Sequence, residues 1–115
     1  MGLIFTSLGN LFRRRFTQNY PKVKPKLPPD FRGKLFHDRS KCIYCGLCEK
    51  YCPSGAIKVD KVKKTWTHDL GKCVFCGQCE ETCHLMPKKD AIKMSTEFEM
   101  ATHNKKSLIR VHEKP

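Results

Sequence analysis

The sequence predicts a small α+β domain built as a pseudo-two-fold repeat, with an amphipathic helix at its N-terminus and extended tails. Three observations lead to this prediction. One cysteine pattern occurs twice, with first cysteines at Cys42 and Cys73, 31 residues apart. A short segment after the first copy alternates apolar and polar residues, as a strand does. Four prolines between positions 21 and 29 exclude a helix ahead of the repeat.

Residues 1–19 are predicted to form the amphipathic helix, because bulky apolar residues recur there every four positions. The arginines at 13–15 would occupy its last turn, where positive charge favours the helix dipole. Such a helix is suited to lie on a membrane surface or in a groove of a membrane subunit. An ordinary helix packed on the domain's own core is the alternative. The apolar face consists of Ile4, Leu8, Phe12 and Phe16.

Residues 20–41 are predicted to be an extended arm, because prolines alternate with lysines there and favour polyproline-like backbone. A free linker is one interpretation. The other is a strap laid over a neighbouring subunit, which the apolar residues of the arm favour. These residues are Tyr20, Val23, Leu27, Phe31 and Phe36.

Residues 42–92 hold the repeat. Each unit is predicted as a ligand loop, a short helix after the third cysteine, the fourth cysteine and then a strand. Residues 57–59 alternate as a strand does and are predicted to pair with residues 65–67. Pro53 is expected to end the first helix. Trp66 is predicted to cover the small core rather than to relay electrons.

Residues 93–115 are predicted to be a polar docking tail with no regular period, part of which lacks structure in isolation. Its docking capacity would rest on its few apolar residues. These are Phe98, Met100, Leu108, Ile109 and Val111.

The two cysteine motifs read C-x₂-C-x₂-C-x₃-C and together use all eight cysteines of the chain. At this spacing three thiolates bind one cubane iron–sulfur cluster, and the fourth reaches a second cluster. A disulfide framework is disfavoured because four cysteines crowd into each stretch of eleven residues, and nothing marks the chain as secreted. Structural zinc uses pairs of C-x₂-C and does not require the third cysteine. Two [4Fe–4S] clusters are therefore the predicted cofactors.

The three-residue spacer carries the fourth cysteine of each motif about one helical turn away, so that it faces the other site. The predicted ligand sets are thus crossed, which ties the two halves together. Gly46 and Gly77, just after the second cysteines, let the backbone approach the clusters closely. The ligands of cluster 1 are predicted to be Cys42, Cys45, Cys48 and Cys83, and those of cluster 2 to be Cys73, Cys76, Cys79 and Cys52.

The two copies differ after their last cysteine. His84 stands where the first copy has Pro53, and four residues are inserted beyond it. One hypothesis is that the imidazole tunes a neighbouring cluster in a proton-linked manner. The alternative is a surface or packing residue beside the inserted loop.

The formal net charge is +12, from 23 Lys and Arg against 11 Asp and Glu. These charges form neither a recognition helix nor an aromatic stacking sheet, so no nucleic acid is predicted as a partner. A membrane surface or an acidic partner suits them better. Lys41 and Lys72 precede the motifs and are expected to place positive charge near both clusters, whereas Lys61, Lys63 and Lys64 are interpreted as solvated surface lysines.

No apolar run is long enough to cross a bilayer, and the arginines at 13–15 follow the N-terminal apolar stretch rather than precede it, unlike a secretory signal. Eight ligand thiolates also indicate a reducing compartment. The sequence therefore predicts a location on the cytoplasmic side.

The paired motifs resemble the bacterial-type two-[4Fe–4S] ferredoxins, and the flanks narrow the resemblance. FTQNYP at 16–21 and LPPDFRGKL at 27–35 resemble the N-terminal arm of the two-cluster subunit of respiratory complex I. STEFEMA at 95–101 resembles the segment after the clusters of that subunit. Relatives of the subunit occur in energy-converting membrane-bound [NiFe] hydrogenases, formate hydrogenlyases and membrane-bound sulfur-reducing complexes. The resemblance covers roughly residues 10–105.

The resemblance implies a bacterial-type two-[4Fe–4S] ferredoxin fold and an electron-relay subunit with no catalytic site or small-molecule substrate of its own. Such a subunit passes single electrons toward the cluster next to the active site and lies peripherally at the cell membrane, on its cytoplasmic side. The implied partners are a [NiFe]-hydrogenase-like large subunit, a one-cluster small subunit and membrane subunits. The short chain and His84 favour the hydrogenase or sulfur-reducing branch over the quinone reductases.

Two other functions stay open at this point. A free, soluble ferredoxin shuttle would carry the same clusters but has no need of the first 41 residues. A zinc-stapled adaptor would use the cysteines without redox chemistry.

Overall fold

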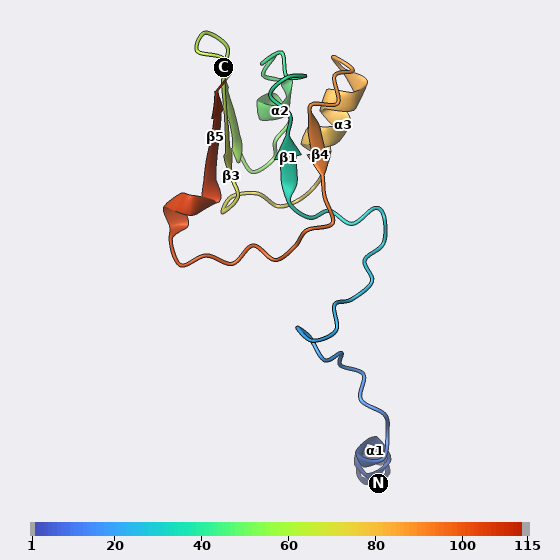
Figure 1. Cartoon of the computed structure of the whole chain (residues 1–115). Helices are drawn as coiled ribbons and strands as arrows, with labels where there is room; N and C mark the ends of the chain where they lie inside the picture. Colours follow the sequence, from blue (N-terminus) through green and yellow to red (C-terminus); the bar gives the residue numbers. More distant parts are fainter. Residues whose placement is uncertain (1, 114–115) are drawn as a thin grey trace.

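Two small antiparallel sheets and two short helices form the domain of this computed structural model, which describes residues 2–113 (Figure 1). The two-stranded sheet pairs β1 (Leu35–His37) with β4 (Ile92–Met94). The three-stranded sheet has the order β2 (Ile57–Asp60), β3 (Thr65–Asp69) and β5 (Ile109–Glu113). The result is a small mixed helix-and-sheet domain, as the sequence predicts.

The predicted hairpin is confirmed. In the register of β2 and β3, Val59 lies opposite Trp66 and Lys58 lies opposite Thr67. Trp66 is only 1% exposed, which confirms its predicted place in the core. The rest of this small apolar core comes from both sheets and from the cysteine loops, and its buried members include Leu35, Tyr44, Ile57, Cys79 and Ile92.

The two short helices, α2 (Leu47–Lys50) and α3 (Gln78–Leu85), pack against each other. Each begins directly after a glycine in the left-handed region, so each starts before the third cysteine rather than after it, as the spacing alone suggested. The first helix ends ahead of Cys52 because Pro53 disfavours helical backbone at the residue before it. The second has no such proline and continues through Cys83.

The N-terminal helix is shorter than the sequence predicts. α1 covers Gly2–Leu11, and the arginines at 13–15 lie beyond its end instead of in its last turn. Gly9 and Asn10 are poor helix formers, and the carbonyl of Asn10 accepts a bond from the amide of Arg13 in the closing turn. All residues of α1 are exposed, so this helix is not packed on the domain's own core. Met1 lies outside the described residues.

Both tails contribute strands that the sequence interpretation missed. β1 comes from the end of the arm, and β5 comes from the tail predicted to have no regular period. A 3₁₀ turn, η1 (Lys105–Leu108), leads into β5, and the side chain of Asn104 caps it. The domain is therefore completed by segments outside the cysteine repeat, one just before it and one near the C-terminus (Figure 1). No helix within residues 2–113 is long and apolar enough to cross a membrane.

Candidate metal centres

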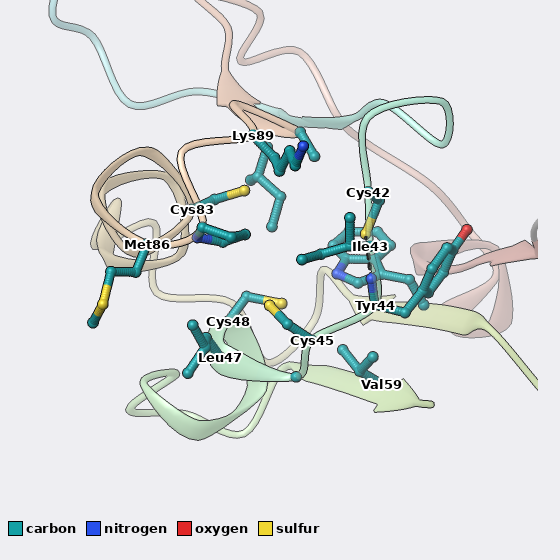
Figure 2. Close-up of a pocket in the computed structure, with 15 residues that line it drawn as sticks. Cys42, Ile43, Tyr44, Cys45, Leu47, Cys48, Val59, Cys83, Met86 and Lys89 are labelled. Atoms are coloured by element: carbon teal, nitrogen blue, oxygen red, sulfur yellow. Dashed lines mark hydrogen bonds between the residues drawn. The ribbon is translucent and has the colours of Figure 1, made fainter. Parts of the chain in front are cut away.

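Cavity 1, of about 370 Å³ including the part open to solvent, opens between the first cysteine loop and α3. Three cysteines of the first motif line it together with the last cysteine of the second motif (Figure 2). The rest of its wall is mostly apolar, with Leu47, Val59 and Trp66 among the lining residues. The four cysteines are Cys42, Cys45, Cys48 and Cys83, the predicted set for cluster 1.

Cavity 2, of about 310 Å³ on the same measure, has the reciprocal lining. Phe75, Ile57 and Met94 supply apolar contacts. Its four cysteines are Cys52, Cys73, Cys76 and Cys79, the predicted set for cluster 2. The folded chain thus brings together both crossed groups of cysteines that the motif spacing indicated.

Each thiolate of a cubane binds a different iron, so the four sulfurs stand apart around the cluster. Consistent with this spacing, no three His, Cys, Asp or Glu side chains within residues 2–113 lie close enough to hold a single metal ion.

The two ligand loops share an unusual backbone. Tyr44 and Phe75, which precede the second cysteines, have φ values of 55° and 52°, in the left-handed region. Gly46 and Gly77, which follow those cysteines, have φ values of 82° and 79°. Two left-handed residues on either side of one cysteine curl the loop around the cavity and turn amide groups inward. Sequence reasoning found the glycines but not the aromatic positions, since left-handed backbone is rare for bulky side chains.

Backbone and side-chain donors already reach the sulfurs. The amide of Tyr44 donates to Cys42 Sγ at 3.4 Å, and the amide of Ala56 donates to Cys52 Sγ at 3.3 Å. Ser54 Oγ lies 3.7 Å from Cys52 Sγ. Although burial raises the pKa of the Cys52 thiol, these hydrogen bonds outweigh it and hold that pKa below its usual value.

Two other cysteines are held as thiols by their surroundings. Burial, with a smaller contribution from neighbouring cysteines, raises the pKa of Cys48 to about 11 and that of Cys79 to about 12. A thiolate at either position requires a compensating positive partner, which an iron atom supplies.

An unpaired buried donor also points to a bound group. The indole nitrogen of Trp66 has no partner within full hydrogen-bond distance among the described residues, although the side chain lines cavity 1. Its weaker interaction with the neighbouring Cys48 thiol lowers the pKa of that thiol, against the larger effect of burial. Leaving a buried donor unsatisfied costs about 1–3 kcal/mol. A cluster with sulfur acceptors fits this position.

Behind Trp66 lies a stack of imidazoles that sequence reasoning did not find. The ring of His37 stacks on the indole with centroids 4.1 Å apart, and His37 Nδ1 lies 3.1 Å from His112 Nδ1. His68, 1% exposed, lies on the other side of Trp66 in the stack. These rings come from β1, β3 and β5, so only the tertiary structure brings them together. The stack belongs to the cluster 1 side of the molecule.

Cations from other segments also lie over the ligand loops, and the effect of Lys41 and Lys72 on the clusters stays a prediction. Lys41 and Lys72 are largely exposed and face Asp38 and Asp69 at 3.9 and 3.8 Å. The Lys61 stem lies over Gly46, where an added Cβ would stand 3.1 Å from Lys61 Cε. At Gly77 an added Cβ would stand 3.5 Å from Arg32 Nε. The local sequence could not predict that Lys61 and Arg32 cover these loops, because each cation comes from a different segment than the loop it covers.

His84 is 71% exposed, and its Nδ1 lies 2.7 Å from Asp90 Oδ1 across the inserted loop. The imidazole holds the pKa of Asp90 below its usual value. This contact favours the surface interpretation of His84, while its proposed tuning of a cluster stays a hypothesis.

Comparison with known proteins identifies the family. Residues 41–85 match the model of the 4Fe-4S dicluster domain. NADH-quinone oxidoreductase subunit I 2 of Geobacter metallireducens is 33% identical over 116 residues, which cover 94% of this chain and 88% of that protein. The chain belongs to the NADH-quinone oxidoreductase subunit I family. The family and its dicluster domain decide in favour of iron–sulfur clusters over a disulfide framework or structural zinc. The chain therefore binds two [4Fe–4S] clusters and is an electron-transfer protein.

Two further known proteins are similar to this chain. F(420)H(2) dehydrogenase subunit I of Methanosarcina mazei is 44% identical over 55 residues, covering 48% of this chain and 31% of that protein. A chain in the structure of the membrane-bound sulfane sulfur reductase, an archaeal respiratory membrane complex, matches with a TM-score of 0.68 and 28% identity. That match covers 85% of this chain but only 53% of the solved one, so this chain spans about half of its length.

Proposed function

We propose that this chain is the electron-relay subunit of a membrane-bound respiratory complex, with clusters held across the two halves of a pseudo-two-fold repeat. Cys42, Cys45, Cys48 and Cys83 hold cluster 1, and Cys73, Cys76, Cys79 and Cys52 hold cluster 2. The observation that carries the proposal is the pair of cavities, each lined by three cysteines of one motif and the last cysteine of the other.

Each cluster, when bound, accepts and releases one electron. The protein's part is to hold the two sites close together and apart from water. Cys48 lies close enough to Cys79, a cysteine of the other ligand set, to raise the pKa of that thiol, and both pack in the shared core. The shared core around Ile57 separates the sites by packed side chains rather than by solvent. Such an arrangement serves single-electron relay.

The subunit I relatives belong to multisubunit complexes, and we propose that this chain likewise works with other subunits. The arm and α1 support this, because their apolar side chains are exposed: Leu3 is 85%, Phe12 is 87% and Phe16 is 88% exposed. Together with the arginines at 13–15 they suit a lipid surface or a membrane subunit. The chain is then peripheral and on the cytoplasmic side.

The partners we propose are a large subunit like that of [NiFe] hydrogenases, a one-cluster small subunit and membrane subunits, with electrons passing toward the cluster nearest the active site. The likeness to the sulfane sulfur reductase chain supports the sulfur-reducing branch. The hydrogenase branch and the domain limits at 19, 41 and 92 stay predictions.

The experiment is affinity purification of the full-length chain from detergent-solubilised membranes under anoxic conditions. We expect other subunits of a membrane complex to co-purify, and dithionite to produce two paramagnetic signals from reduced [4Fe–4S] clusters. Recovery of a brown protein in the supernatant after membranes are pelleted would instead identify a soluble ferredoxin shuttle. A colourless protein without acid-labile sulfide would identify a zinc adaptor.

A further inference from the structure

Arg32 of the arm lies against the loop that carries cluster 2. Its side chain covers Gly77, where an added Cβ would stand 3.5 Å from Arg32 Nε and 3.8 Å from Cζ. Arg32, Gly77 and Cys76 line one cavity at the surface. Cys76 is the cysteine that the structure leaves exposed, so charge at this rim acts on a cluster through little intervening protein.

The charges around this rim are unequal. Asp30, Glu80 and Glu81 line the same cavity, and Arg32 alone among its described lining residues has a fixed positive charge. Reduction adds one negative charge to a [4Fe–4S] cluster, so a nearby guanidinium stabilises the reduced state and nearby carboxylates oppose it. Arg32 therefore offsets an otherwise acidic surround.

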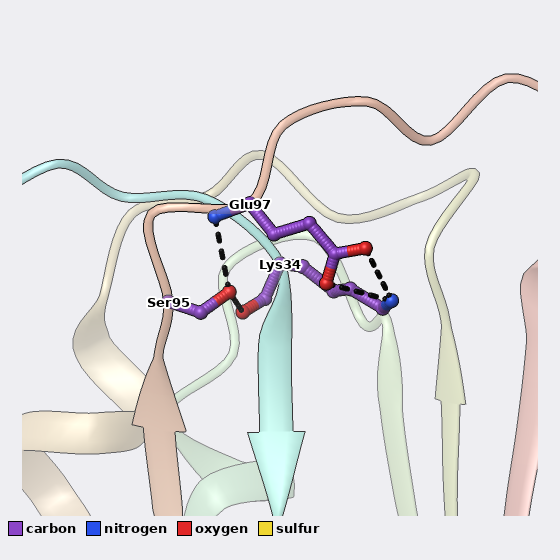
Figure 3. A network of polar contacts seen from close by, with 3 residues as sticks. All are labelled: Lys34, Ser95 and Glu97. Atoms are coloured by element: carbon purple, nitrogen blue, oxygen red, sulfur yellow. Dashed lines mark hydrogen bonds and ion pairs between the residues drawn. The ribbon is translucent and has the colours of Figure 1, made fainter. Parts of the chain in front are cut away.

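The position of Arg32 depends on how the arm is attached. The amide of Gly33 donates to Ser95 O at 2.8 Å, and the amide of Lys34 donates to Glu97 O at 2.7 Å. Ser95 returns two bonds to Lys34 O, and Lys34 Nζ lies 2.9 Å from both carboxylate oxygens of Glu97 (Figure 3). Gly33 is buried, and an added Cβ there would collide with the carbonyl oxygens of Ser95 and Glu97. The contacts of residues 33, 34, 95 and 97 form what we call the arm clip.

We propose that Arg32 stabilises reduced cluster 2 and that the arm clip, by holding Arg32 in place, makes the potential of this cluster depend on the docked arm. The inference rests on the ligand sets proposed above. No arm residue is among the described residues that line cavity 1, so we expect no such dependence for cluster 1. The cations on its side are Lys89, which lines cavity 1, and Lys61 of the β2–β3 hairpin, which lies over Gly46. An arm that also contacts another subunit would thereby link assembly to the energetics of one cluster only.

The first test changes the charge at Arg32. Full-length protein with Arg32→Gln, purified anoxically in its complex, is titrated with reductant while each cluster is followed by paramagnetic resonance. At a fixed ambient potential we expect the ratio of reduced to oxidised cluster 2 to fall about three- to tenfold, since a surface charge pair is worth on the order of 1 kcal/mol. A tenfold change corresponds to about 59 mV for a one-electron couple. The ratio for cluster 1 should not change.

Three matched variants identify the cause. Arg32→Lys keeps the charge and should retain most of the wild-type ratio. Arg14→Gln makes the same change in net charge at the far end of the arm and should have no effect. Lys61→Gln should lower the ratio for cluster 1 and leave cluster 2 unchanged, which also assigns the two signals. If Arg32→Lys shifts cluster 2 as much as Arg32→Gln, charge is not the cause and the inference is wrong.

The second test moves the arm without changing any charge. Gly33→Ala should lower the cluster 2 ratio in the same direction as Arg32→Gln, and the double variant should be no lower than Arg32→Gln alone. If Gly33→Ala prevents assembly, Glu97→Gln replaces it. Loss of the Glu97 carboxylate by itself would raise the ratio of reduced to oxidised cluster 2, whereas release of Arg32 lowers it. A fall in this ratio therefore supports the inference, and a rise contradicts it.

The outcomes separate this inference from the proposed function. An intact two-cluster spectrum in wild type and Arg32→Gln, with equal ratios in both, overturns the inference and leaves the electron relay standing. Absence of two cluster signals from the wild-type protein overturns the relay itself.

Discussion

The first and second cysteine loops share one motif but occupy different surroundings. The first loop faces cavity 1, whose wall includes Trp66 with the imidazole stack behind it. The second faces cavity 2, next to the exposed Cys76 and the arm residue Arg32. Its helix also runs through Cys83, whereas the first helix ends before Cys52. Each cluster is expected to have four cysteine ligands, but the surroundings of the two sites differ. The two clusters should therefore differ in their exposure to solvent and in how far their potentials depend on the rest of the chain.

The largest expected effect is the loss of one cluster when a cysteine in the loop of the other cluster is replaced. Cys52→Ser should remove or convert cluster 2 and leave cluster 1 intact, because Cys52 lines cavity 2. Iron content and the paramagnetic signals after dithionite measure this. Cys83→Ser is the reciprocal variant and should affect cluster 1. Damage confined to the cluster of the mutated residue's own loop would contradict the crossed ligand sets.

The second-largest effect is expected from removal of the Trp66 indole, and it should act on the side of the molecule that holds cluster 1. Trp66→Ala is expected to reduce the free energy of unfolding by about 3–5 kcal/mol, because it empties a fully buried site. Thermal unfolding of the cluster-loaded protein measures it. Trp66→Phe keeps most of the packing but lacks the N–H, so it should shift the cluster 1 signal with a much smaller loss of stability. An unchanged cluster 1 signal would show that the N–H does not reach the cluster.

A fall in pH should also reduce the stability of the cluster 1 side of the molecule before that of the cluster 2 side. Burial, together with the charges of His112 and Arg39 and against the opposing charge of Asp38, lowers the pKa of His37 to about 4. Below pH 6.5 the unfolded chain takes up a proton that the folded chain refuses, so stability is lost as the pH falls from about 6.5 to about 4. After discounting for solvent screening, about 1–2 kcal/mol is expected from this residue.

Hydrogen exchange of β1 and β5 over this pH range measures the loss. His37→Gln should flatten the pH dependence. His103→Gln, at an exposed position in the tail, is the control and should not alter it. Equal acid sensitivity in wild type and His37→Gln would remove the stack as the cause.

The smallest effect is expected at the residue that most distinguishes the two motifs. His84 is exposed and bonded to Asp90, so His84→Gln should leave both midpoint potentials and their profiles between pH 6 and 8 unchanged. A potential that varies with pH in the wild type but not in this variant would instead support proton-linked tuning by His84.

The repeat shows how much of the site local sequence predicts. The spacing of the cysteines indicated both ligand sets, since three residues on a short helix determine which way the fourth side chain faces. The β2–β3 hairpin followed from the alternation of residues 57–59 and their predicted pairing with residues 65–67. The end of α1 did not, because the apolar spacing continues to Phe16 although the helix stops at Leu11.

β5 illustrates a different limit. Its apolar residues Ile109 and Val111 are 44% and 52% exposed, while Arg110 and His112 are less exposed and His112 lies opposite Trp66 of β3 and contacts it. This strand therefore reverses the usual rule that apolar residues face inward, and alternation would have assigned the wrong face. Only its pairing with β3 decided the orientation.

By itself the sequence determined the cofactors and the hairpin of the core, and it predicted which cysteines belong to each cluster, because these depend on residue types at short, fixed spacings. The tertiary structure alone decided that Arg32 covers the second loop, that Lys61 covers the first, and that three histidines stack around Trp66. Apart from the contact of His68 with Trp66, which lie two residues apart on β3, these contacts join segments that are separated along the chain. Their proximity follows from strand pairing and packing of the whole domain, for which local residue patterns carry no signal.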